Sequence, residues 1–195
     1  MLAAAVAVVA PMLAVGQVNP EATLSGDQAS PYKYEVYAGY AYTSLKQINL
    51  SRHPLQGGKI ALTRDFGKYF MLTGSYDYLR VPLGSGGLKN PGNPSIYSFL
   101  VSPGVHAEIY EKLGGRVWAE FGGEHTGGES MTPSVSFAGG FGVGMTYDLT
   151  RHWMVQVSGD RLQGSFSLTD NSAQLAYSTH RSWNTRASFG AAYRF

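Results

Sequence analysis

Ionisable side chains of both signs are spread along this chain, although only 14% of its residues are charged. Carboxylates within reach of basic groups can act as general acids and bases, or they can relay protons. The side chains that suit such chemistry are Glu35, Lys59, Asp77, His106, Glu108, Glu120, Asp148, Asp160, Arg186 and Arg194. If folding brings them together, they form either a reactive site or a set of structural ion pairs.

The cysteine and histidine content and the net charge exclude several classes of chemistry. The chain has no cysteine, which excludes disulfides, thiol catalysis and cysteine-ligated metals. Its five histidines show no H-x-x-x-H or similar ligand spacing, so we expect no metal site and no cofactor. A net charge of +2 is too close to balance to indicate a nucleic-acid surface. The histidines are His53, His106, His125, His152 and His180.

The last stretch, residues 183–195, indicates how such side chains are positioned. It alternates between an apolar set with aromatics at both ends and a set that is polar or small. A soluble strand usually has five or six residues, whereas a tilted strand that crosses hydrocarbon needs about 9 to 11 and carries aromatic belts. We therefore predict a transmembrane β-strand.

Seven further stretches alternate with the same period of two. The links between stretches are short and long in turn, which is typical of an up-and-down barrel. The sequence thus predicts an all-β fold, an eight-stranded antiparallel transmembrane barrel. Because the strand count is even, both termini should lie on the short-turn side, the periplasm. The seven stretches are residues 34–44, 56–66, 70–80, 95–110, 116–124, 135–149 and 153–161.

The segment before the barrel divides into two parts. Residues 1–16 are apolar and uncharged, and they end in Ala14-Val15-Gly16, which fits a signal peptide and its cleavage site. A buried or membrane-spanning helix is the alternative. Residues 17–33 read as a polar periplasmic lead-in, and residues 34–195 as the barrel.

An eight-stranded barrel is only wide enough to be filled by its own side chains. We therefore interpret the ten ionisable residues as a paired polar plug rather than as catalysts or a proton path. A soluble lipocalin-like barrel would instead turn its apolar face inward, and charged side chains would not suit such a core.

Pro103 lies in the middle of a predicted strand and removes one backbone donor, which predicts a bulge or bend there.

Residues 137–160 and the closing N-T-R-A-S-F-G-A-A-Y-R-F resemble the eight-stranded outer-membrane barrels of the opacity-protein, OmpX and OmpA-barrel superfamily. The resemblance implies a bacterial outer-membrane location, contact with outer-membrane lipids and lipopolysaccharide, and insertion by the barrel-assembly machinery. In that superfamily a terminal Phe with a Tyr two positions before it resembles the insertion signal, here Phe195 and Tyr193. We do not expect the peptidoglycan-anchoring domain that OmpA carries after its barrel.

One short motif keeps an enzymatic alternative open. His180-Arg181-Ser182 resembles the His-x-Ser of the lipid A deacylase barrels. Two features argue against it: Ser182 shares parity with the inward face, and Trp183 replaces the small residues that follow that serine. The alternatives to a non-enzymatic barrel are therefore an enzyme that modifies lipid A and a narrow channel.

We expect the function to lie in the long loops, with a structural or adhesin-like role and an unknown surface ligand. The longest link, residues 162–181, suggests a protruding hairpin that turns near Asp170-Asn171, or a disordered hydrophilic tip. We expect the protein to be a monomer without nucleic-acid partners. The candidate binding residues of this loop are Phe166, Leu168, Leu175 and Tyr177.

Overall fold

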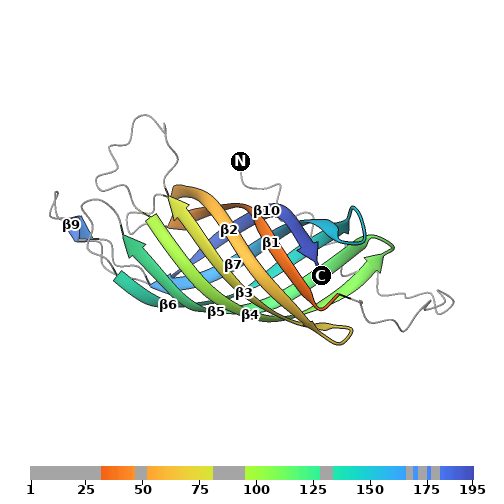
Figure 1. Ribbon diagram of the computed structural model, residues 1–195. Helices are drawn as coiled ribbons and strands as arrows, with labels where there is room; N and C mark the ends of the chain where they lie inside the picture. The colour runs from red at the N-terminus through yellow and green to blue at the C-terminus, as the bar shows by residue number, and fades with distance from the viewer. Residues whose placement is uncertain are drawn as a thin grey trace, which may run out of the picture.

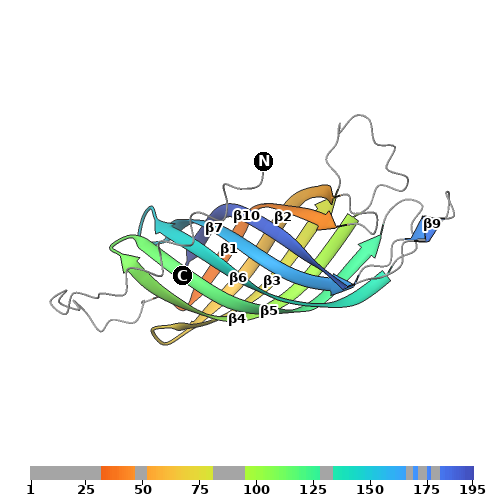
Figure 2. The same ribbon diagram turned by 180° about the vertical axis from the view of Figure 1, so that it is seen from behind.

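Eight strands close into one antiparallel barrel, in the order β1-β10-β7-β6-β5-β4-β3-β2. The computed structural model describes residues 32–46, 52–80, 95–127, 134–165, 169–170, 175–176 and 181–195. The tilted strands wrap around a common axis (Figures 1 and 2). The predicted fold is therefore confirmed. The barrel strands are β1 (Tyr34–Lys46), β2 (Arg52–Phe66), β3 (Phe70–Arg80), β4 (Ser95–Tyr110), β5 (Leu113–Gly127), β6 (Ser134–Asp148), β7 (Trp153–Ser165) and β10 (Arg181–Arg194).

The first and last strands close the sheet. β1 pairs with β10 from Glu35–Arg194 to Ser44–Thr185. Beyond this ladder the amide of Tyr34 donates to the carbonyl of Phe195 at 3.1 Å, and the amide of Phe195 donates to the carbonyl of Tyr34 at 2.9 Å. Closure gives every barrel strand a neighbour on both sides, and it places the two ends of the barrel sequence side by side.

Short turns join the strands at the end of the barrel where Tyr34 and Phe195 lie. The β2–β3 turn spans Gly67–Tyr69, and Gly67 has φ of 72°, which glycine adopts without strain. In the β6–β7 turn, the Thr150 hydroxyl accepts from the amides of His152 and Trp153 at 3.3 and 3.0 Å. The φ angle of Gly67 and the hydrogen bonds of Thr150 fix the shapes of these two turns, and the shape of a turn sets the pairing register of its hairpin.

The long connections leave from the opposite end, and their central parts lie outside the described residues. The strands next to them are longer than predicted, since β1 and β2 stay paired out to Lys46–Arg52. A small hairpin of β8 (Thr169–Asp170) and β9 (Leu175–Ala176) belongs to the longest connection and lies beyond this end of the barrel (Figure 1). Its pairs are Thr169–Ala176 and Asp170–Leu175, and the residues between them, where the turn near Asp170-Asn171 was predicted, lie outside the described residues.

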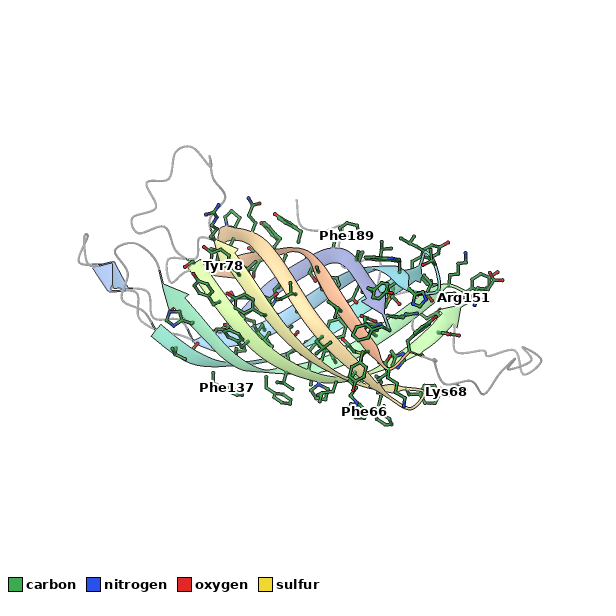
Figure 3. The ribbon with its side chains drawn as sticks, viewed as in Figure 1. Phe66, Lys68, Tyr78, Phe137, Arg151 and Phe189 are labelled. Atoms are coloured by element: carbon green, nitrogen blue, oxygen red, sulfur yellow. The ribbon has the colours of Figure 1, made fainter. Side chains whose placement is uncertain are left out.

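The barrel is apolar outside and polar inside. Ile60 and Phe189 expose 57% and 58% of their surface on the outer face, whereas Asp77 is fully buried inside. Phe66, Phe137 and Phe189 point away from the barrel (Figure 3). This polarity is the reverse of that of a soluble ligand-binding barrel, so that alternative is wrong. No helix long and apolar enough to cross a bilayer occurs in the part of the chain that the structure describes.

Pro103 does not produce the predicted bulge. The β4–β5 register is the same at Val101–Phe121 and at Gly104–Trp118, on either side of the proline. The β3–β4 ladder runs through Leu72–Pro103 without a shift, so the neighbouring strand holds the register. The irregularity lies instead between Glu108 and Tyr110, next to the β4–β5 turn.

The outward position of Val143 gives a direct test of the lipid-facing surface. This residue is 49% exposed and lies between the outward aromatics Phe137 and Tyr147 on β6. Val143→Arg should destabilise the protein folded in lipid vesicles by about 2–4 kcal/mol, because the charge must enter hydrocarbon. Leu149→Arg, in the β6–β7 turn, is the matched control and should cost only about 0–1 kcal/mol. Equal costs for both variants in denaturant titrations would contradict the assigned face.

Candidate functional site

Arg186 is the centre of an ion-pair network in the middle of the lumen. Its guanidinium donates to Asp77 at 2.7 Å and lies 3.6 Å from carboxylate oxygens of both Glu120 and Asp160. Lys59 lies 3.4 Å from the same Asp160 oxygen. All five side chains are buried, and they come from β10, β3, β5, β7 and β2. Arg186 on β10 therefore contacts side chains from three other strands of the barrel, β3, β5 and β7.

A second network closes the lumen nearer the short turns. Arg116 on β5 binds both oxygens of Glu35 on β1, with N–O distances of 2.7 and 2.6 Å. Arg194 lies 3.0 Å from Asp148 and 3.8 Å from Glu35. Two-point pairing of a guanidinium with a carboxylate is among the strongest geometries available to charged side chains.

Trp118 fills the space between the two networks. Its indole donates to Glu120 at 3.0 Å. Gly142 and Gly144 on the adjacent β6 make room for the ring, since a Cβ on Gly142 would come within 2.4 Å of it. A void of about 30 Å³ remains between the networks, enough for a water molecule. The middle of the barrel is thus filled by side chains.

The lumen opens towards the short turns into a polar hollow of about 400 Å³. His106 lines it, with Nε2 3.7 Å from Asp65. Glu108 also lines it but is exposed and lies outside the buried plug, because β4 runs past the enclosed part of the barrel towards its bulge. Assigning Glu108 to the plug was therefore wrong.

The other predicted plug residues lie inside the barrel. Six are buried in the two networks, and three lie partly exposed at the mouth. The six are Glu35, Lys59, Asp77, Glu120, Asp160 and Arg186; the three are His106, Asp148 and Arg194.

Among the buried charged residues of the described lumen, sequence reasoning missed Arg116 and Glu124. Both lie an even number of residues from Glu120 on β5, so the alternation of the strand could have assigned them to the lumen. One oxygen of Glu124 accepts from the Ser98 hydroxyl at 3.2 Å, and the other has no hydrogen-bond partner. In the described lumen around Arg186, the carboxylates Asp77, Glu120, Glu124 and Asp160 thus face only the cations Arg186 and Lys59.

The arrangement supports structural pairing better than catalysis. Each buried carboxylate of the two networks lies beside a fixed cation, so none is a free base next to a space for a substrate. Among the described side chains, no group of three or more His, Asp or Glu is placed to hold a metal ion. Ser182 has the parity of the lumen-facing Asn184, and His180 lies outside the described residues.

The predicted insertion signal lies on the outer face at the short-turn end. Tyr193 and Phe195 are 38% and 53% exposed, and their rings stack at 6.3 Å. Trp153 packs against Tyr193 at 5.1 Å and Tyr34 against Phe195 at 5.8 Å. Their role in insertion stays a prediction.

The candidate loop residues are mostly outside the described part of the chain. Phe166, Leu168 and Tyr177 lie there, whereas Leu175 belongs to the backbone of β9. Their part in binding also stays a prediction.

Comparison with known proteins identifies the fold. No protein-family model matches the sequence, and no curated protein matches it. Neisserial surface protein A (NspA) aligns over 83% of this chain and 97% of its own, with a TM-score of 0.61 and 13% identity. Ail, the attachment invasion locus protein of Yersinia pestis, aligns over 84% and 99%, with a TM-score of 0.51 and 15% identity. Outer membrane protein AlkL aligns over 91% and 97%, with a TM-score of 0.51 and 13% identity. The chain therefore has the fold of the eight-stranded outer-membrane barrels.

The Arg116–Glu35 pair should depend on guanidinium geometry and not only on charge. Arg116→Lys keeps the charge but cannot make both hydrogen bonds, so it should cost about 1.5–3 kcal/mol of folding stability. Arg151→Lys, exposed in the β6–β7 turn, is the control and should change stability by less than about 0.5 kcal/mol. Denaturant titrations of both variants in lipid vesicles measure the difference. A neutral Arg116→Lys would show that the pair is replaceable by a point charge.

Proposed function

We propose that this protein is a non-enzymatic, non-conducting barrel of a bacterial outer membrane that acts through its long loops. The observation that carries the proposal is the filled lumen. Arg186 and Arg116 pair across it with side chains of other strands, and the void between their networks is about 30 Å³. Since side chains occupy the path through the barrel, specific recognition is left to the loop end.

We further propose that the short turns and both termini face the periplasm and the long connections face outward. Barrels of the outer membrane have short periplasmic turns and longer extracellular loops. Tyr34 and Phe195 lie together at the short-turn end, which agrees with this orientation. The barrel-assembly machinery would recognise Tyr193 and Phe195 at this end during insertion.

The loop end also supports a role in surface interaction. The β8–β9 hairpin adds paired backbone beyond the barrel, and a protruding hairpin can offer a strand edge to a partner. Ail, named for attachment and invasion, has a barrel of the same fold, so the fold is compatible with an adhesin-like role. Its structure in complex with the heparin analogue sucrose octasulfate suggests sulfated glycans as a first class of ligand to test.

The filled lumen predicts the electrical behaviour of the purified protein. In planar bilayers the full chain should give no steady current, only small flickering events, because ions cannot pass the two networks. An established porin in the same bilayer serves as the positive control. Stable porin-like steps from this protein would overturn the non-conducting proposal.

Removal of the longest connection tests the proposed site of recognition. Ser165 pairs with Arg181, so residues 166–180 can be replaced by an Asn-Gly turn without disturbing the β7–β10 ladder. Cells that display the full chain should bind one or more members of a panel of glycans and proteins, and this variant should lose that binding while still folding. The same replacement of residues 81–94, between the paired Arg80 and Ser95, is the matched control. Binding that survives the first deletion unchanged would place recognition elsewhere.

A further inference from the structure

The outer face of β1–β4 carries an apolar groove of about 560 Å³. Gly74 lies in its floor, where an added Cβ would meet no atom within 4 Å. In the two ladders of β3, Gly74 pairs with Leu62 and with Val101, whose side chains form walls on either side. The missing side chain therefore leaves a notch in the lipid-facing surface. Its apolar lining comes from Val36, Ile60, Leu62, Tyr76, Phe99 and Val101.

An aromatic cluster continues from the groove towards the loop end. Tyr76 packs against Phe99 at 4.7 Å and lies 6.4 Å from Tyr97, which packs against Tyr78 at 4.7 Å. His125 lies 6.1 Å from Tyr97. Tyr78 lies at the end of the barrel from which the long connections leave (Figure 3). The first part of this cluster belongs to the groove, so the two features form one surface.

Arg80 is the last residue of β3 and follows Tyr76 and Tyr78 towards the loop end of the barrel. It is exposed, and its place in the alternation of β3 is that of Gly74 and Tyr78, on the outer face. Within the described part of the chain it forms no ion pair. Along β3 the outer surface thus changes from an apolar notch at Gly74 to phenol rings and then to a cation.

We propose that this surface binds one acylated, phosphorylated sugar lipid of the outer leaflet. An acyl chain would lie in the groove over Gly74, a sugar ring would stack on Tyr76, Tyr78 and Tyr97, and Arg80 would bind a phosphate. The order apolar, aromatic, cationic matches the order of chain, sugar and phosphate in such a lipid. The proposal rests on the proposed orientation, because the loop end must face the leaflet that contains this lipid.

A lipid suits the groove better than a second copy of the chain. Lipid tails are as apolar as the groove, so two barrels gain no hydrophobic free energy by pressing apolar faces together in a bilayer. A groove with protruding rings on one side also fits a single flexible chain better than it fits the convex wall of another barrel. Arg80 and the tyrosine hydroxyls, in addition, need polar partners at headgroup depth.

The test uses the full chain, purified in detergent, and native mass spectrometry with two probes. The first probe is diphosphorylated, hexa-acylated lipid A; the second is phosphatidylglycerol, which has acyl chains and a phosphate but no sugar. Gly74→Phe fills the groove. Gly159→Phe is the matched control, since Gly159 also faces outward into open space but lies on β7, across the barrel from β3.

The unchanged protein should retain one lipid A at concentrations at which phosphatidylglycerol is lost. Gly74→Phe should weaken lipid A binding about tenfold or more, because the phenyl ring would occupy the groove in which the acyl chain lies. Gly159→Phe should bind lipid A as the unchanged protein does. Arg80→Gln should weaken binding of diphosphorylated lipid A several-fold. Equal lipid A binding by Gly74→Phe and Gly159→Phe, or equal retention of both probes, would overturn the proposal. These measurements need neither loop ligand nor bilayer current, so their failure is distinct from a failure of the proposed function.

Discussion

Hydrocarbon offers no hydrogen-bond partner to a peptide group, and this constraint governs the whole structure. A sheet that crosses a membrane must pair every strand, so it has to close on itself. Here closure is made by β1 and β10, which pair from Glu35–Arg194 to Ser44–Thr185. Once the sheet is closed, alternation sends one half of the side chains to lipid and the other half into an interior about as wide as the side chains themselves.

That enclosed interior explains why charged residues are retained in a chain with few charges. Arg186 contacts Asp160 on the adjacent strand β7, but it also reaches Asp77 on β3 and Glu120 on β5, and Arg116 reaches Glu35 on β1. Each cation therefore also joins strands that are not neighbours in the sheet. Desolvation offsets much of the attraction within a buried pair, so we infer that these pairs serve more to select one arrangement than to add stability. The outer face is under a different constraint. It needs only to be apolar, so a notch such as that at Gly74 can be kept for a ligand.

The alternation of single residues was enough to predict the barrel, because a period of two assigns Phe189 outward and Arg186 inward without knowledge of any contact. The ends of the strands were harder to predict from the sequence. Strands that stay paired beyond the hydrocarbon, as at Lys46–Arg52, carry no alternation of apolar and polar residues there. Arg116 and Glu124 could have been found from parity alone. The partners in each pair could not, because which strands face each other depends on the closed geometry. Pro103 was expected to cause a bulge or bend in its strand. Pairing with β5 is interrupted at Ser102 and Pro103, but the register is the same on both sides, and both residues stay paired with β3.

The central claim is that charges paired across the lumen hold the closed barrel in one arrangement. A double-mutant cycle on Arg186 and Asp77 tests it most directly, with Arg186→Met, Asp77→Leu and the combined variant unfolded from lipid vesicles under identical conditions. We expect a coupling free energy of about 1–3 kcal/mol, with the double variant more stable than the sum of the single losses implies. Losses that add to within about 0.3–0.5 kcal/mol would show that the two side chains act independently, and would contradict it.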